Sequence, residues 1–306
     1  MQTVERQRAK LFQRSVTEAR DLTPRELALM NHVRRYRLVS SADLALLDGG
    51  SHQNVLRILR DLFDLGLLER PKAQVANWID GGARPMIYGL SNKGARLLRL
   101  YEDEGDLSEN NRRAGAVFVH HTAEIASFMV RLEVACRSQG HISLLTREDI
   151  LDNAPAKTRM MREPLRLRMP TSAAGKRTAS VIPDEFFGLA YPNDTAAYFF
   201  LELDRGTMPI VRKGSDRTSF ARKLSTYWQA WKAGKYAEQF GVKHVRVLTV
   251  APSRERVATM IEATRAITNG SGSGLFLFVD RETFCRSDAL ATEFVNAKRE
   301  TVRLLD

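Results

Sequence analysis

Hydrophobic positions in the first part of the chain recur with the spacing of short helices. A helix is predicted after Thr23, because Pro24 suits the first helical position and Glu26 stands three residues after the cap. A second helix is predicted from Ser40 or Ser41 to Gly49. The inward face of the first helix is apolar: Leu27, Met30 and Val33.

The third predicted helix begins after Ser51 and has two distinct faces. Its inward residues are apolar: Val55, Leu59, Leu62 and Phe63. The opposite face is polar: Asn54, Arg57, Asp61 and Asp64. A strand, a Gly-rich turn, a second strand at 86–90 and a helix capped by Ser91 follow. Three helices and a β-hairpin predict a winged helix-turn-helix over residues 22–101.

Strands and helices alternate in the second half of the chain. A helix at 120–140 and a strand at 141–146 precede a basic stretch, 153–180, and two short strands that contain acids. A long helix, a buried strand at 244–252, an amphipathic helix and a last strand at 274–280 complete the order. This order predicts a mixed sheet covered on both faces. The predicted fold class is therefore α/β (α+β), with the winged helix-turn-helix first and a mixed-sheet domain second.

Polar segments without periodicity give the expected boundaries. We expect a charged N-terminal arm at 1–21, the winged helix-turn-helix domain at 22–101, a linker at 102–116 and the mixed-sheet domain at 117–306.

Composition narrows the class of partner. The 306 residues carry a formal net charge of +11, which suits a partner that bears phosphates. The two cysteines have no paired spacing, which argues against a zinc site and a disulfide framework. No signal peptide or membrane-spanning run is evident, so we expect a cytoplasmic protein that does not contact membranes.

The third helix is the expected reader of DNA. In a winged helix this element enters the major groove, where Asn and Gln pair with adenine and Arg pairs with guanine. Phosphate contacts are expected from the wing and from the alternating segment "PLRLRMP". The alternative is a winged helix that binds protein. The predicted DNA-binding residues are His52, Gln53, Asn54, Arg57, Lys72, Arg84, Arg166 and Arg168.

Acidic residues interrupt the two apolar strands of the second domain. With their element order, "IPD" at 182–184 and "ELD" at 202–204 resemble the PD-(D/E)xK nuclease signature, except that Asp204 stands where that family has lysine. The resemblance implies that residues 117–306 form a restriction-endonuclease-like mixed-sheet domain, a PD-(D/E)xK nuclease-like α/β domain. It also implies a Mg²⁺ site at Asp184, Glu202 and Asp204 that activates water for phosphodiester cleavage. Lys223, on the following helix, is the candidate replacement for the lysine. The alternative is that the acids form ion pairs with Arg205 or the basic loop.

A broader resemblance covers most of the chain. The winged helix, "HHTAEIASF", "LRLRMP…VIPDEFF", "FLELDRGT" and "KLSTYWQAW" resemble the replication-relaxation family of plasmids and integrative elements. The resemblance implies work in plasmid replication, relaxation or mobilisation, with double-stranded DNA and replication or conjugation proteins as partners. Winged-helix proteins often bind as dimers, so a homodimer is also expected.

Three functions follow from these observations. The first is a mobile-element DNA protein that nicks DNA with Mg²⁺ through Asp184, Glu202, Asp204 and Lys223. The second is a non-catalytic transcription regulator or replication initiator, in which a degenerate nuclease fold binds DNA or dimerises. The third is relaxation by a tyrosine nucleophile, Tyr227 or Tyr236, although Trp228 and Trp231 predict that their helix mainly packs.

Overall fold

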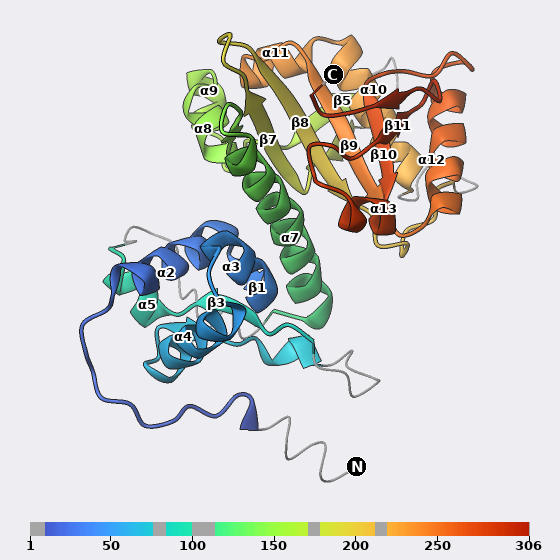
Figure 1. Ribbon diagram of the computed structural model, residues 1–306. Coiled ribbons are helices and arrows are strands. Elements are labelled where there is room, and N and C mark those ends of the chain that lie inside the picture. The colour runs from blue at the N-terminus through green and yellow to red at the C-terminus, as the bar shows by residue number, and fades with distance from the viewer. Residues whose placement is uncertain (1–9, 76–83, 100–113, 171–177, 212–218, 306) are drawn as a thin grey trace. The chain divides into compact units, whose positions relative to one another are not determined.

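The computed structural model describes residues 10–75, 84–99, 114–170, 178–211 and 219–305 (Figure 1). The chain divides into two units, Met1–Val134 and Ala135–Asp306. The predicted linker at 102–116 lies largely outside the described residues, as does the first part of the predicted arm. No helix in the described ranges is long and apolar enough to cross a bilayer.

The helices of the N-terminal unit begin where the sequence places their caps. Thr23 and Glu26 form a reciprocal capping box at the start of α2. Ser40 and Ser91 accept backbone hydrogen bonds at the starts of α3 and α5, and Gly49 ends α3 with φ of 69°. These predictions are confirmed. The helices are α2 (Pro24–Tyr36), α3 (Ser41–Asp48), α4 (His52–Asp64), α5 (Asn92–Leu97) and α7 (Ala116–Gln139).

A small antiparallel sheet accompanies these helices, in the order β1-β3-β2. Its strands are β1 (Leu38–Ser40), β2 (Leu68–Glu69) and β3 (Ile87–Leu90). The sequence reading missed β1, which follows directly on α2 after Arg37. Lys72 begins a short 3₁₀ helix, Lys72–Val75, and the segment 76–83 that follows lies outside the described residues.

The inward face of α4 builds the core of this unit. Val55, Leu59 and Leu62 are fully buried, as the helical spacing predicts. Ala126 and Val130, from α7, join the same apolar cluster. This part of α7 therefore belongs to the packing of the N-terminal unit.

The C-terminal unit is built on a mixed sheet of seven described strands, in the order β12-β11-β10-β9-β8-β7-β4. Strands β8, β9 and β10 are parallel to one another, and the strands that flank them pair antiparallel. The mixed α/β fold class is thereby confirmed. The strands are β4 (Ser143–Leu145), β7 (Glu185–Ala190), β8 (Ala196–Leu203), β9 (Val245–Ala251), β10 (Phe276–Asp280), β11 (Phe294–Asn296) and β12 (Thr301–Val302).

Two helices provide the crossovers between the parallel strands. α10 connects β8 with β9 and α12 connects β9 with β10, and both contribute to one apolar cluster on the same face of the sheet (Figure 1). The ring of Phe200 is central to this cluster and lies 5.7 Å from that of Tyr227 and 5.3 Å from that of Tyr236. The helices of this unit are α8 (Arg147–Asp152), α9 (Ala156–Arg159), α10 (Phe220–Lys232), α11 (Lys235–Phe240), α12 (Arg254–Ile267) and α13 (Arg281–Arg286).

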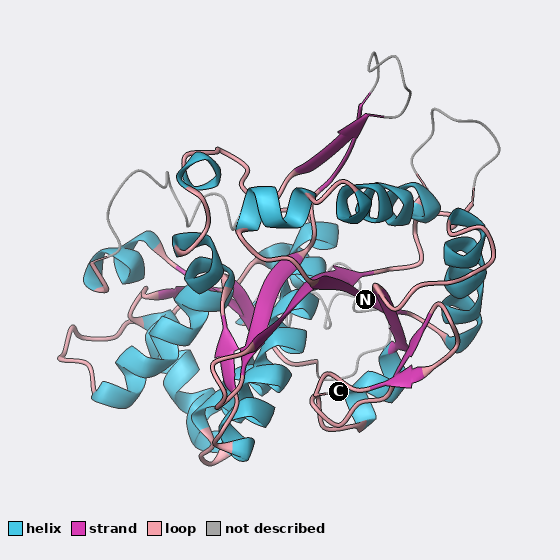
Figure 2. Cartoon of the chain, turned by 90° about the horizontal axis from the view of Figure 1, so that it is seen from above, coloured by secondary structure: helices cyan, strands magenta, loops and turns pink. Residues whose placement is uncertain are grey.

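The basic stretch contains a separate two-stranded hairpin, β5 (Leu167–Pro170) with β6 (Thr178–Val181). Buried and exposed residues alternate along both strands, as the sequence predicts for β5. The hairpin contacts α10 and stands out from the sheet in Figure 2.

Candidate functional site

Asp184 lies directly before β7 and is anchored to the end of β8. Its backbone N–H donates to the Leu201 carbonyl at 2.9 Å, and its Oδ2 accepts from the Leu203 N–H at 2.7 Å. The antiparallel register pairs Glu185 with Leu201 and Phe186 with Phe200, so Asp184 and Glu202 project from the same face of the sheet as Phe186 and Phe200. The structure thus brings these two predicted carboxylates to neighbouring places on one sheet face.

Glu202 is held by two side chains of α10. It lies on β8 and is only 2% exposed. Its Oε2 is 2.5 Å from Lys223 Nζ, and its Oε1 accepts a hydrogen bond from the Tyr227 hydroxyl at 2.6 Å. Lys223 and Tyr227 are four residues apart, so one helical turn directs both toward the same carboxylate. We call Asp184, Glu202, Lys223 and Tyr227 the Glu202 site.

Burial dominates the electrostatics of this site. It raises the pKa of Glu202 to about 7, and the nearby Asp184 carboxylate adds to this against the lowering effect of Lys223. Burial alone would lower the pKa of Lys223, but the Glu202 and Asp184 carboxylates raise it above its ordinary value. Lys223 therefore remains a cation, and Glu202 is poised to exchange a proton near neutral pH.

A buried hydroxyl lies beside Glu202 on the next strand. Thr249, on β9, pairs with Glu202 in the parallel register and is fully buried. Its Oγ1 has no hydrogen-bond partner among the described residues. A buried hydroxyl without a partner lowers the stability of the folded state. Together, Thr249 and Glu202 make this part of the core polar.

Asp204 has a different partner from the other predicted acids. Arg256, on α12, donates from both Nε and Nη2 to the two carboxylate oxygens, with Nη2 at 3.0 Å from Oδ1. The same Nη2 donates to the Met208 carbonyl at 2.5 Å. Sequence reasoning missed Arg256. The only signal was an arginine two residues after Arg254 at the start of a predicted helix, which does not indicate a partner.

This arrangement bears on the predicted magnesium site. Within the described ranges, no group of three or more His, Cys, Asp or Glu side chains is arranged to hold a metal ion. Arg256 takes both oxygens of Asp204, whereas Asp184 and Glu202 lie together. Mg²⁺ is often bound through one or two carboxylates, with water and phosphate oxygens as further ligands. The carboxylate oxygens of Asp184 and Glu202 are of the type in this donor set, and Glu202, like Asp204, already has a partner on each oxygen, Tyr227 and Lys223. The magnesium site at Asp184, Glu202 and Asp204 stays a prediction.

The two candidate tyrosines are both inside the core. Tyr227 is 0% and Tyr236 is 1% exposed. The Tyr236 hydroxyl donates to the Tyr227 carbonyl at 2.9 Å, and burial raises the pKa of both phenols. A tyrosine nucleophile must reach a DNA phosphate with its phenol oxygen, and neither buried hydroxyl is placed to do so.

The polar face of α4 is exposed throughout its first turns. The four predicted base-reading residues are all exposed, whereas Val55 between them is buried. Leu56, on the same stretch, is also partly exposed. The four residues are His52, Gln53, Asn54 and Arg57.

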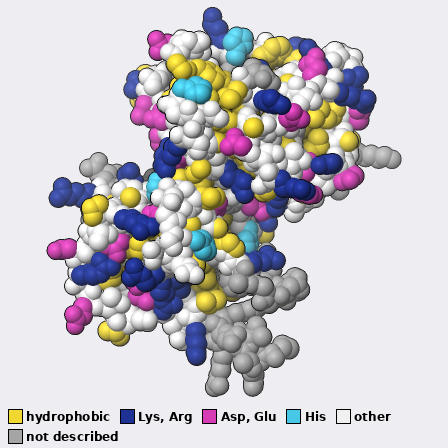
Figure 3. Space-filling view, viewed as in Figure 1, with side chains coloured by type: hydrophobic (Ala, Val, Ile, Leu, Met, Phe, Trp, Pro, Cys, Tyr) yellow, Lys and Arg dark blue, Asp and Glu magenta, His cyan; other side chains and the backbone are white. Residues whose placement is uncertain are grey.

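The predicted phosphate-contacting residues lie in different surroundings. Lys72 and Arg84 are exposed on either side of the segment 76–83. Arg168 is exposed on β5. Arg166 pairs with Glu163 through two hydrogen bonds of 2.7 Å and donates to Ser180, so its charge is already partly neutralised. Lys and Arg side chains are dispersed among acids over the face shown in Figure 3.

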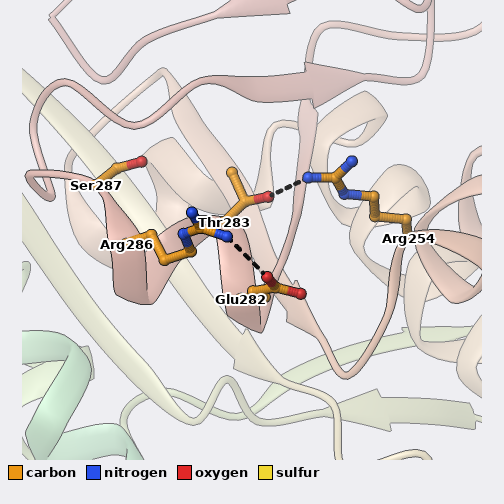
Figure 4. Close-up of a pocket in the computed structure, with 5 residues that line it drawn as sticks. All are labelled: Arg254, Glu282, Thr283, Arg286 and Ser287. Atoms are coloured by element: carbon orange, nitrogen blue, oxygen red, sulfur yellow. Dashed lines mark hydrogen bonds and ion pairs between the residues drawn. The ribbon is translucent and has the colours of Figure 1, made fainter.

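A shallow pocket of about 320 Å³ lies at the carboxyl ends of β9 and β10 (Figure 4). Arg254 donates to Thr283 at 3.5 Å, and Arg286 pairs with Glu282 at 3.1 Å. None of the predicted site residues lines this pocket, whose remaining lining residue is Ser287.

Comparison with known proteins gives the family. The fold defines a mixed α/β protein with a buried acid–lysine site at the end of β8. A family model described as Replication-relaxation matches residues 30–264, a span that includes α4 and the Glu202 site. No curated protein and no solved structure matches the chain. The chain belongs to the replication-relaxation family, and membership supports a role in replication or relaxation.

Proposed function

We propose that the protein binds double-stranded DNA through a winged helix-turn-helix in its N-terminal unit and acts in plasmid or mobile-element replication, relaxation or mobilisation. Three helices followed by paired strands β2 and β3, with β1 completing the sheet, support the winged-helix interpretation. The family and the net charge of +11 support DNA as the partner.

The observation that carries the proposal is the exposed polar face at the start of α4. Gln53, Asn54 and Arg57 are base-reading residue types, and all three are exposed while the apolar side of the helix is buried. A helix held rigidly by its apolar face can present such side chains to a groove without further ordering. Lys72, Arg84 and Arg168 are the proposed phosphate contacts.

Fluorescence anisotropy with a duplex from the region upstream of the protein's own coding sequence tests this proposal. Arg57→Ala and Asn54→Ala should each weaken binding to that duplex by roughly 5- to 100-fold and leave binding to unrelated duplexes nearly unchanged. Arg286→Ala, an exposed arginine of α13, is the matched control and should bind as the wild type does. Equal affinities in all four proteins would refute the assignment of α4.

We further propose metal-dependent nicking by the C-terminal unit as a second function. The observation that favours it is the contact of 2.5 Å between Lys223 and Glu202, with Asp184 beside them on the same sheet face. Asp184 and Glu202 are the proposed ligands, and Mg²⁺, when bound, would lower the pKa of a water and neutralise charge on the phosphate. Lys223 would hold a proton on Nζ and orient the attacking water. Asp204, paired with Arg256, fixes the end of β8 beside the site.

A nicking assay on supercoiled plasmid that carries the upstream region distinguishes this function from its alternative. Wild-type protein should produce open circles with Mg²⁺ or Mn²⁺, and Glu202→Gln and Lys223→Met should not, although both should still bind DNA. If the wild type binds but never nicks, the alternative holds: a transcription regulator or replication initiator that uses a degenerate nuclease fold for DNA binding or dimerisation. Light scattering on the same samples would report a homodimer.

A further inference from the structure

Two tryptophans form a stacked pair on α10. The ring centroids of Trp228 and Trp231 are 4.8 Å apart and the rings are inclined by 20°. Trp228 packs against the edge of the apolar cluster, and Trp231 is 41% exposed. The Nζ atom of Lys232 lies 5.9 Å from the centre of the Trp228 ring. The sequence predicts that this helix mainly packs, and its buried face does so, while Trp231 lies on its exposed side.

The core of the unit does not need Trp231. The inward face of α10 is formed by Leu224, Tyr227 and Ala230, all of which are buried. Phe200, Tyr236 and Phe240 fill the space beneath them. Trp231 is stacked on Trp228 and is 41% exposed, so part of its indole ring is accessible to a ligand.

We propose that Trp228 and Trp231 form a stacking platform for unpaired bases of single-stranded DNA. Stacking of bases on exposed aromatic rings, with lysines or arginines near the phosphates, is how proteins bind single strands without sequence preference. Lys232 supplies a cation beside the rings, and the chain is strongly basic. A duplex keeps its base faces stacked on each other, so the platform selects unpaired DNA.

The inference rests on the proposed role with DNA but uses a different surface from α4. Replication passes through unpaired strands, and an opened region of the duplex would expose bases for capture. The Lys232 cation beside Trp228 favours a polyanion over an apolar protein partner.

Tryptophan fluorescence provides a direct measurement. The chain has three tryptophans, and Trp78→Phe removes the third, which lies outside the described residues. In this background, titration with oligothymidylate should quench the remaining fluorescence. Trp231→Ala should weaken single-strand binding about tenfold, whereas Trp231→Phe should retain most of it because a flat ring remains. Met160→Ala, another exposed apolar residue, is the matched control.

Each result decides the question. Unchanged single-strand affinity in Trp231→Ala would overturn the proposal, as would an equal loss of duplex affinity. Loss of self-association by Trp231→Ala, with single-strand affinity intact, would assign the surface to a second copy of the chain and also overturn it. If Arg57→Ala leaves duplex binding unchanged while Trp231→Ala abolishes single-strand binding, the assignment of α4 fails and the platform stands.

Discussion

Lys223 Nζ and Glu202 Oε2 are 2.5 Å apart, and the carboxylate is almost wholly buried while the side chain of the lysine is 31% exposed. The pair therefore connects the interior of the C-terminal unit with its surface. A carboxylate buried this deeply is stable only with such a partner or with a proton.

Glu202 should make stability depend on pH. Its folded pKa of about 7 exceeds the ordinary value of 4.5, so the folded state binds the proton more tightly than the unfolded state. The stabilisation that comes from this tighter proton binding is complete below pH 4.5. It is lost as the pH rises through 7 and amounts to at most roughly 3 kcal/mol. In urea unfolding between pH 4.5 and 7, the free energy of unfolding of the wild type should fall as the pH rises. That of Glu202→Gln should not show this slope. Glu163→Gln, on the surface, should keep the wild-type slope.

Removal of the Tyr227 hydroxyl should expose the dependence of Glu202 on its donors. Tyr227→Phe leaves Oε1 of a buried carboxylate without its hydrogen bond, which should cost about 1–3 kcal/mol in unfolding experiments at neutral pH. The hydrogen bond from Tyr227 lowers the pKa of Glu202. Its loss should therefore shift the slope of unfolding free energy against pH to higher pH. Tyr236→Phe loses only a bond to a backbone carbonyl and should not move the slope. An unmoved slope in Tyr227→Phe would contradict the geometry.

Thr249→Val should be neutral or stabilising. The buried Oγ1 of Thr249 has no partner among the described residues, so its replacement by a methyl group of similar shape removes an uncompensated polar atom. We expect an increase of up to about 1 kcal/mol in the free energy of unfolding. Thr264→Val is the control, because the Thr264 hydroxyl donates to the Met260 carbonyl and its loss should not stabilise. Clear destabilisation by Thr249→Val would indicate that a water bridges this hydroxyl to Glu202.

The Asp204–Arg256 pair should be strongly coupled. Asp204 is 6% exposed and receives two hydrogen bonds from Arg256, so loss of either partner leaves a buried charge. Each single alanine variant should cost about 3–5 kcal/mol, and the double variant should cost much less than their sum. The exposed pair Arg303–Glu293 serves as the comparison and should show less than about 1 kcal/mol of coupling.

Gly94 should not tolerate a side chain. A Cβ atom there would lie 2.2 Å from the Leu67 carbonyl oxygen, which is backbone and cannot move aside. Gly94→Ala should lower the melting temperature of the N-terminal unit and weaken duplex binding with it. Gly115→Ala has open space around it and should melt as the wild type does.

Local features of the fold could be predicted because their causes are local. The cap of α2 rests on Thr23 and Glu26, which are three residues apart, and the buried face of α4 follows from helical spacing. Strand β1 could not be predicted, since its three residues form a strand only by pairing with β3, about fifty positions further along the chain.

The candidate site could be predicted only in part for the same reason. The nuclease resemblance predicts Asp184, Glu202 and Lys223 as site residues. In the structure Lys223 contacts Glu202, and Asp184 lies on the same sheet face. The partner of Asp204 comes from α12, fifty-two residues away, and nothing in the short motif specifies it. The burial of Tyr227 depends on the aromatic cluster beneath α10, which no single segment encodes.

The packing of Ala126 and Val130 has a practical consequence for the preparation of the N-terminal unit by itself. A fragment that ends in the polar segment 102–116 would lack both residues and leave the apolar cluster of this unit incomplete. A fragment that runs to Val134 would keep the core closed. Such a fragment would also retain Glu133, whose carboxylate accepts a hydrogen bond from Tyr36 and pairs with Arg35 at 3.2 Å. The N-terminal unit therefore ends within α7, at Val134.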